Sequence, residues 1–203
     1  MNTLKIPDTI NAYDQFHEVY DQETKDFWNN FPNSTIGAFL VRLNGKKILD
    51  IGSGPGRDAM LLKMRGLKIV CVDASKEMVK RTKDIGFQSI LSDVRNINLP
   101  SESFDGAWAY TSLLHINQAE LEKVIVKIHN LLNPGGVFLI GMIEGNFEGD
   151  IEQESMPGAK RYFKYYSELQ LRQMIEKAGF NYEFQEKYIP HKRVYLTQIY
   201  RRT

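Results

Sequence analysis

The sequence predicts an α/β fold in which an open, mostly parallel sheet carries helices on both faces. Short apolar runs, typical of buried strands, alternate along the chain with longer stretches whose apolar residues recur at helical spacing. Three alternating glycines, Gly52, Gly54 and Gly56, follow the first of these runs, and a helical stretch begins directly after them. Strands that alternate with helices are typical of a parallel sheet, because each parallel crossover needs a helix.

Length and composition are those of one globular domain. The 203 residues are 42% hydrophobic and 25% charged, which suits a single buried core. Residues 1–10 lack a signal-type start and no 18-residue apolar run occurs. We therefore expect a soluble, cytoplasmic protein without a membrane partner, as a monomer or homodimer. The one cysteine, Cys71, is expected to be a buried thiol, and no Cys/His cluster has metal-site spacing, so no metal is expected.

Two helices are expected before the first strand. Residues 12–30 place four aromatic side chains at mostly helical spacing among acidic residues, and residues 36–43 form a second amphipathic stretch. Asn44 and Gly45 end it. The first strand, residues 47–51, then leads into the glycine turn.

The glycine turn predicts a ligand site. Without a Cβ, Gly52, Gly54 and Gly56 can adopt positive φ and let the backbone approach a ligand, while the amides that open the next helix face an anionic group. Glycine turns between a strand and a helix also serve plain packing. The second strand favours the ligand site over plain packing. It covers residues 68–72 and is followed by Asp73, about 20 residues beyond the glycines.

An acid at the end of the second strand can accept hydrogen bonds from both hydroxyls of a ribose, so the pattern predicts a nucleoside with an anionic arm. A dinucleotide-binding turn has the form G-x-G-x-x-G, and Arg57 occupies the place of its third glycine here. The nicotinamide pattern therefore fails at one of its three glycines.

The alternation of strands and helices continues to the end of the chain. The further elements expected are a helix over 75–85, strands over 89–91, 104–110 and 137–143, helices over 117–132 and 167–178, and an antiparallel strand pair over 182–188 and 194–200. In such a sheet ligands bind beyond the carboxyl ends of the strands, where Asp50, Asp73, Asp93 and Tyr110 fall.

These motifs, in this order, resemble those of the class I S-adenosylmethionine-dependent methyltransferases over residues 45–180. The motifs that carry the resemblance are the glycine motif at 48–56, a ribose motif at 72–75 with Met78, an adenine motif at 92–94, and strand signatures at 104–109 and 132–137. The resemblance implies a Rossmann-like, doubly wound sheet of seven strands with an antiparallel C-terminal pair. It also implies S-adenosylmethionine as cofactor and S-adenosylhomocysteine as product.

The resemblance further implies how the domain is organised and which residues hold the cofactor. We expect a helical cap over 1–44, a cofactor-binding core over 45–143, a substrate loop over 144–166, and a helix with a strand pair over 167–203. The cofactor contacts expected are Tyr13, Asp50, Gly52, Gly54, Gly56, Asp73, Ala74, Met78, Asp93, Val94 and Tyr110.

Within that set the expected roles differ. The glycines admit the methionine portion and Asp50 orients their loop or the amino group, whereas Asp73 binds the ribose. Asp93 and Val94 bind adenine; in the alternative interpretation Asp93 caps the turn before Asn96. Tyr13, in a segment similar to the N-terminal helix of many small-molecule methyltransferases, lies over the cofactor or packs on the core.

Catalytic and substrate residues are less well defined by the sequence. His115, after the fourth strand, is a candidate proton acceptor, although a histidine here also packs and hydrogen-bonds locally. Tyr110 is the second candidate. Residues 144–160 form a long polar stretch without a clear period, which we expect to be a loop that closes over the acceptor. The residues expected to bind an anionic or aromatic acceptor, or alternatively to join the core, are Tyr20, Arg161, Tyr162 and Tyr165.

The sequence thus predicts a methyltransferase that acts on a small molecule by in-line displacement. A tRNA wobble-base methyltransferase is the alternative, because residues 157–203 carry ten basic and four acidic side chains and residues 161–166 resemble some wobble-base enzymes. Since the chain shows no appended RNA-binding module, we place nucleic acid second. A nicotinamide-dependent oxidoreductase and a cofactor-binding protein without catalysis are the remaining alternatives.

Overall fold

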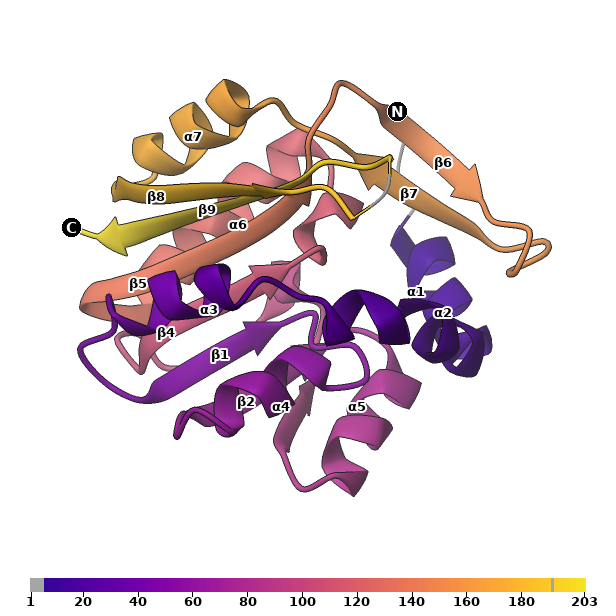
Figure 1. The fold of residues 1–203 in the computed structure, drawn as a ribbon, viewed down its shortest axis with the longest axis horizontal. Helices are drawn as coiled ribbons and strands as arrows, with labels where there is room; N and C mark the ends of the chain where they lie inside the picture. Colours follow the sequence, from indigo (N-terminus) through magenta and orange to yellow (C-terminus); the bar gives the residue numbers. More distant parts are fainter. Residues whose placement is uncertain (1–5, 191) are drawn as a thin grey trace.

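The computed structural model describes residues 6–190 and 192–203 and contains a central seven-stranded sheet (Figure 1). The strands are β1 (Lys47–Ile51), β2 (Lys68–Asp73), β3 (Gln88–Leu91), β4 (Phe104–Tyr110), β5 (Leu132–Ile143), β8 (Phe180–Tyr188) and β9 (Tyr195–Arg202). Their spatial order is β3-β2-β1-β4-β5-β9-β8. The first five are parallel, whereas β9 pairs antiparallel with both β5 and β8. The predicted sheet is confirmed.

Helices cover both faces of the sheet. They are α1 (Ile6–Gln15), α2 (His17–Asn29), α3 (Asn33–Leu40), α4 (Arg57–Lys63), α5 (Lys76–Asp84), α6 (Gln118–Leu131) and α7 (Glu168–Lys177), with short 3-10 turns η1 (Val94–Asn96) and η2 (Leu113–His115). No helix in the described part of the chain is long and apolar enough to cross a membrane.

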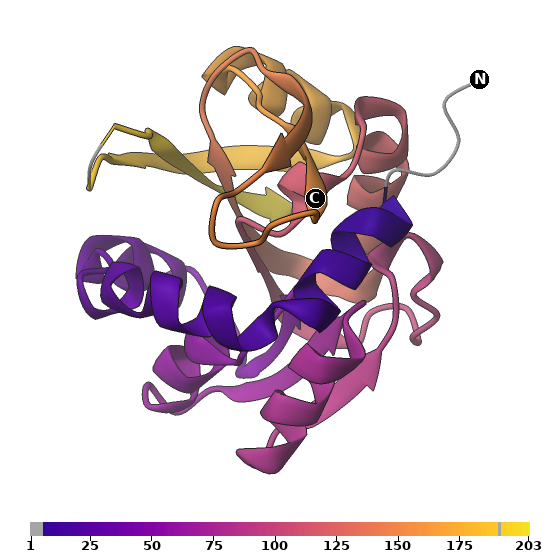
Figure 2. The ribbon, with the colours of Figure 1, turned by 90° about the vertical axis from the view of Figure 1, so that its right-hand side faces the viewer.

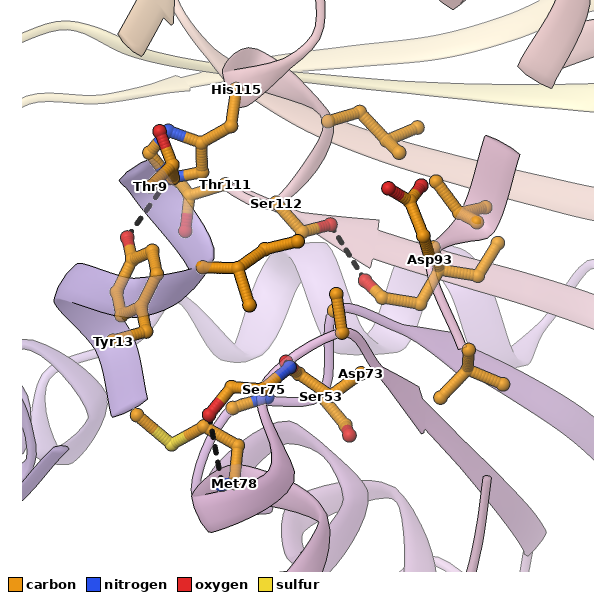
Figure 3. A pocket seen from close by; sticks show the side chains of 18 of the residues that line it. Thr9, Tyr13, Ser53, Asp73, Ser75, Met78, Asp93, Thr111, Ser112 and His115 are labelled. Carbon is orange, nitrogen blue, oxygen red and sulfur yellow. Dashed lines mark hydrogen bonds between the residues drawn. The ribbon is translucent and has the colours of Figure 1, made fainter. Parts of the chain in front are cut away.

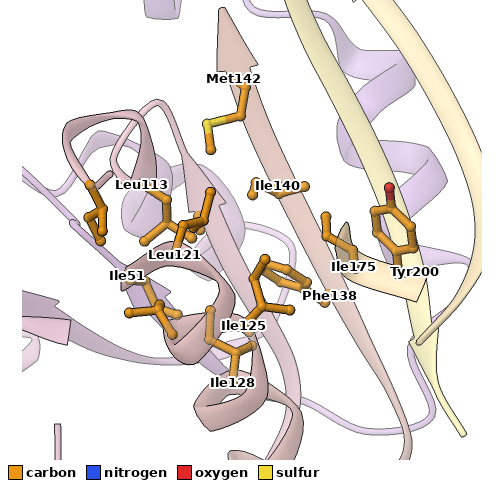
Figure 4. Close-up of a cluster of buried hydrophobic side chains, with 14 of the residues drawn as sticks. Ile51, Leu113, Leu121, Ile125, Ile128, Phe138, Ile140, Met142, Ile175 and Tyr200 are labelled. Carbon is orange, nitrogen blue, oxygen red and sulfur yellow. The ribbon is translucent and has the colours of Figure 1, made fainter. Parts of the chain in front are cut away.

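Two apolar layers result from the alternation of side chains along the strands. On one face α6 and α7 pack against strand residues such as Ile51, Phe138 and Ile140 (Figure 4). On the other face α3 and α4 pack against Ile48 and Trp108. The sheet is therefore buried on both sides, and its carboxyl edge is the place left for a ligand.

The N-terminal helix differs from its prediction. The single helix expected over 12–30 is in fact two helices, α1 and α2, with a bend at Phe16. The bend lets the two helices pack on different parts of the fold: α1 contacts the strand that carries Tyr162, while Phe27 of α2 packs against the ring of Tyr195 on β9. The two contacts therefore lie on different helices.

The expectation of a loop over 144–160 was also wrong in part. Within it, β6 (Glu148–Glu152) pairs antiparallel with β7 (Lys160–Lys164) and forms a separate two-stranded sheet. The chain is polar here, yet Glu148 lies opposite Lys164 and Glu152 lies opposite Lys160. Cross-strand pairs of opposite charge stabilise a ribbon without an apolar period, so a search for apolar periodicity misses it.

The β6–β7 hairpin and α1 lie together beyond the carboxyl ends of the parallel strands (Figure 2). The backbone N–H of Tyr162 on β7 donates to the hydroxyl of Thr9 on α1 at 3.0 Å. These two elements therefore form a cover over the edge of the sheet at which a ligand is expected.

Candidate active site

A cavity opens beyond the carboxyl ends of β1, β2 and β4 (Figure 3). The order of the strands reverses between β1 and β4, which is where open α/β sheets bind their ligands. The predicted cofactor residues that line the cavity are Tyr13, Gly52, Gly54, Asp73, Ala74, Met78, Asp93, Val94 and Tyr110. Asp50 and Gly56 are the two predicted cofactor residues that do not line it.

The three glycines share a left-handed backbone but have different surroundings. All have positive φ, at 68°, 51° and 89° for Gly52, Gly54 and Gly56. A Cβ on Gly52 would lie 2.2 Å from the Cβ of Ser112, and one on Gly56 would press on Thr82 and Ile85 of the α5 region. At Gly54 the nearest atom would be 3.9 Å away. Close packing therefore excludes a side chain at Gly52 and Gly56. Gly52 and Gly54 both line the cavity, and Gly54 is the one with open space beside it.

Asp73 holds the glycine turn in place. Its Oδ2 accepts from the backbone N–H of Gly54 at 2.8 Å, and its Oδ1 accepts from the N–H of Ser75 at 2.8 Å. Burial raises the pKa of this carboxyl, and the two backbone donors oppose that shift. Each carboxylate oxygen keeps lone pairs for a further donor, and the side chain lines the cavity.

Asp93 caps η1, as one of the two interpretations predicted. Its Oδ1 accepts from the N–H of Arg95 at 2.9 Å, and the guanidinium of Arg95 pairs with Oδ2 at 2.5 Å. Partial burial opposes ionisation, but the hydrogen bonds and charge of Arg95 outweigh it and keep the pKa of Asp93 below its ordinary value. The side chain also lines the cavity. Capping of η1 therefore does not conflict with the predicted contact between Asp93 and adenine, which stays a prediction.

An acidic residue that the sequence analysis missed, Asp58, lies at the cavity beside Asp50. Asp58 accepts from the indole N–H of Trp108 at 2.9 Å, and its other oxygen has no hydrogen-bond partner among the described residues. Burial, opposed by that hydrogen bond, raises the pKa of Asp58 to about 8. Burial and the neighbouring carboxyls of Asp58 and Asp73 also raise the pKa of Asp50, which lies behind the turn and is 1% exposed.

A signal for Asp58 is present in the sequence. An acid in the first turn of a helix after a glycine turn interacts favourably with the helix dipole, and a buried tryptophan N–H requires an acceptor. Neither signal predicts that the two side chains are in contact, because Trp108 follows Asp58 by 50 residues and their contact depends on the tertiary fold.

His115 lies in a chain of hydrogen bonds that joins three elements. Its Nδ1 lies 2.6 Å from the carbonyl oxygen of Tyr162 on β7, and its Nε2 lies 2.9 Å from the hydroxyl of Tyr13 on α1. A carbonyl only accepts, so Nδ1 carries the proton and Nε2 accepts from Tyr13. Arg161 donates to the same Tyr13 hydroxyl at 3.0 Å. Burial lowers the pKa of His115 to about 4, and the charge of Arg161 lowers it further, so this imidazole is neutral at pH 7.

Tyr110 forms part of the cavity wall. Its ring packs edge-on against Phe31 at 4.9 Å between centroids, and it is 4% exposed. Burial raises the pKa of its phenol, opposed by a hydrogen bond with Thr197. The phenol therefore stays protonated near neutral pH, and its catalytic role remains a prediction.

A second cavity of about 1000 Å³ adjoins the first. The residues that line both are Tyr13, Tyr20, Thr111 and His115. Of the residues predicted to bind the acceptor, Tyr20 and Arg161 line the second cavity, whereas Tyr162 and Tyr165 do not. The hydroxyl of Tyr162 donates to Glu148 within the hairpin at 2.7 Å, and the ring of Tyr165 packs against Phe147.

Known proteins are similar to this chain in sequence and in fold. Residues 49–140 match the family model described as a methyltransferase domain. The chain is 26% identical over 141 residues to phosphoethanolamine N-methyltransferase 3 of Arabidopsis thaliana, a match that covers 66% of this chain and 29% of the relative. This chain thus spans less than a third of that relative's length.

Solved structures share the fold. The 1,6-didemethyltoxoflavin-N1-methyltransferase of Burkholderia thailandensis, solved with 1,6-didemethyltoxoflavin and S-adenosylhomocysteine bound, has a TM-score of 0.74 at 19% identity, over 100% of this chain and 92% of its own. The CcbJ methyltransferase of Streptomyces caelestis has a TM-score of 0.70 at 18% identity, over 95% and 98% of the two chains.

The strand order of this sheet and the cavity at its carboxyl edge are those expected of a class I S-adenosylmethionine-dependent methyltransferase. Residues 49–140 match the methyltransferase domain model, and the solved structures named above share the fold of the whole chain. The resemblance stated from the sequence motifs is thereby confirmed.

Replacing Asp58 with Asn should make the folded protein less sensitive to alkaline pH. Because folding raises the pKa of Asp58 from 3.8 to about 8, its contribution to stability is present below the lower value and is lost as the pH rises through the higher one. Asn still accepts from Trp108 but cannot ionise. Thermal unfolding without ligand should show a smaller drop between pH 6 and pH 9 in Asp58→Asn, by at least about 3 °C.

Asp84→Asn is the matched control for this experiment, because Asp84 is exposed at the end of α5. Its variant should lose as much stability between the two pH values as the wild type does. An equal loss in Asp58→Asn would contradict the buried, protonated state inferred for Asp58.

Proposed function

We propose that this protein transfers the methyl group of S-adenosylmethionine to a small-molecule acceptor. The observation that carries the proposal is the junction of the two cavities at Tyr13, Tyr20, Thr111 and His115. A donor bound in the first cavity faces an acceptor bound in the second across these side chains. Displacement at a methyl group requires such an in-line approach, and positioning alone can contribute about 7–11 kcal/mol to catalysis.

The residues of the first cavity fit the cofactor. Asp73 has lone pairs for ribose hydroxyls, and the open side of Gly54 leaves room for a ligand at the turn. The Oδ1 of Asp58 and the hydroxyl of Ser53 are buried without hydrogen-bond partners among the described residues. They are suitable acceptors for the ammonium group of the methionine arm. When bound, S-adenosylmethionine supplies a methyl group activated by the positive charge of its sulfonium.

The protein's own contribution is to position the acceptor, exclude water and, for some acceptors, take up a proton. The cover formed by α1 and the β6–β7 hairpin closes the edge of the sheet. His115 presents a neutral Nε2 to the junction, held in orientation by the carbonyl of Tyr162. When an acceptor replaces the hydroxyl of Tyr13 at this nitrogen, His115 can accept its proton. Acceptors that attack without losing a proton need no base.

A small acceptor is favoured over tRNA by the state of the basic side chains. Of the ten in residues 157–203, those paired with carboxylates are Lys164, Arg172, Lys187, Arg201 and Arg202. Carboxylates of the described residues thus neutralise half of the ten basic side chains in the C-terminal quarter, which weakens it as a phosphate-binding face. The second cavity has the size typical of small-molecule pockets, and the similar proteins named above are called methyltransferases of phosphoethanolamine and didemethyltoxoflavin.

Calorimetric titration tests the cofactor. We expect S-adenosylmethionine and S-adenosylhomocysteine to bind and NADH not to bind, because Arg57 replaces the third glycine of the nicotinamide turn and pairs instead with Asp21 at 2.5 Å. Binding of NADH alone would contradict the proposal and favour an oxidoreductase.

A glycine substitution tests where the cofactor lies. Gly54→Ala should weaken S-adenosylhomocysteine binding by about 10-fold or more, because the new methyl group enters the space left for the ligand and the backbone has a positive φ. Gly86→Ala carries a similar backbone strain at φ 84°, with nothing within 4 Å of the new Cβ. This control should lower stability by about 1 kcal/mol and leave binding unchanged; equal binding by both variants would place the cofactor elsewhere.

A further inference from the structure

Arg161 on β7 is a buried cation without a carboxylate partner among the described residues. The residue is 5% exposed, and no ion pair of Arg161 occurs in residues 6–190 and 192–203. Its guanidinium lies over the rings of Tyr13 and Phe163, at 5.1 and 5.4 Å from their centroids. It donates to the Tyr13 hydroxyl and to the side-chain oxygen of Gln153.

Other arginines in this region are neutralised. Arg57 pairs with Asp21 at 2.5 Å, and Arg95 pairs with Asp93 at 2.5 Å, although both are more exposed than Arg161. Burial of an uncompensated charge is costly. A guanidinium has five N–H donors in a planar fork that matches carboxylate and phosphate oxygens. The contacts described here use two of its nitrogens, and the side chain lines the second cavity.

Arg161 also lies close to the junction of the two cavities. Its Nη1 is 3.0 Å from the hydroxyl of Tyr13, which is 2.9 Å from the Nε2 of His115. Two consecutive hydrogen bonds therefore separate the guanidinium of Arg161 from the Nε2 of His115, which faces the junction. An anion bound to Arg161 would lie close to the place where the acceptor meets the methyl donor. An acceptor that reaches both places has its anionic group only a few bonds from the atom that attacks the methyl group.

We propose that the methyl acceptor is an anionic small molecule whose carboxylate or phosphate binds Arg161, a few bonds from the atom that is methylated. This inference rests on the proposed function, since it names the acceptor of the same site. The rings of Tyr13 and Phe163 flank the guanidinium, and Arg161 is only 5% exposed. Low exposure lowers the local dielectric, which strengthens a charge-assisted hydrogen bond.

The anion has a second effect on the site. Burial first, and then the charge of Arg161, keep the pKa of His115 low. A bound anion offsets the charge of Arg161, so the imidazole becomes a better proton acceptor when the acceptor is in place.

The experiment measures how four probes of one ring size bind to the protein saturated with S-adenosylhomocysteine. Benzoate and phenyl phosphate carry the two anions, and benzyl alcohol and benzylamine are the neutral and cationic controls. By NMR titration we expect one or both anions to bind more tightly than the controls. Arg161→Gln should weaken that binding by about 10-fold or more, and Arg161→Lys, which keeps the charge but not the fork, by less.

Arg193→Gln is the matched control, because Arg193 lines the same cavity but is exposed at its rim. Its variant should bind the anions within about 2-fold of the wild type in moderate salt. Which anion binds distinguishes a carboxylate acceptor from a phosphate acceptor. The inference is overturned if the controls bind as tightly as the anions, if no anion binds, or if Arg161→Gln keeps wild-type anion affinity.

The same titrations separate this inference from the proposed function. If S-adenosylhomocysteine binds and the anions fail these criteria, only the anionic acceptor is wrong. If S-adenosylhomocysteine itself does not bind, the proposed function fails and the inference fails with it.

Discussion

The two hydrogen bonds that Asp73 accepts from backbone N–H groups are the constraint on which the site depends. They tie the glycine turn after β1 to the start of α5 after β2, and so fix two adjacent strand ends as one rigid edge. The hydrogen bond from the Gly54 N–H to Asp73 also holds the backbone of Gly54 in its left-handed conformation. A carboxylate that is already oriented by two backbone donors loses little freedom when a ligand hydroxyl adds a third contact.

The junction of the two cavities depends on a second, longer-range set of contacts. Arg161, Tyr13, His115 and the carbonyl of Tyr162 are joined in sequence by hydrogen bonds, so β7, α1 and η2 meet at one point. The first cavity is thus built at the ends of neighbouring strands, whereas its junction with the second cavity is built from segments that lie far apart in the chain. Under the proposed function, the acceptor side can therefore change while the cofactor side is kept.

The same difference explains what the sequence could predict. Gly54 and Asp73 belong to local motifs on successive strands, so their meeting follows from the alternation of strands and helices. Asp58 and Trp108, by contrast, are 50 residues apart and meet because β1 and β4 are neighbours in the sheet. The hairpin at 148–164 could not be predicted because it has no apolar period, although charged residues such as Glu148 and Lys164 pair across its strands. The bend at Phe16 follows from tertiary packing of Phe27 and α1, which local helical spacing does not encode.

The most direct test of the site is a comparison of S-adenosylhomocysteine with its 2′-deoxy analogue, on the wild type and on Asp73→Asn. Asn keeps one acceptor oxygen for the backbone, which preserves the turn better than alanine would. If Asp73 binds the ribose, loss of the hydroxyl should weaken binding to the wild type by about 10-fold or more and should matter much less in the variant. If the variant discriminates between the two ligands as strongly as the wild type does, the ribose does not lie at Asp73 and the placement of the cofactor is wrong.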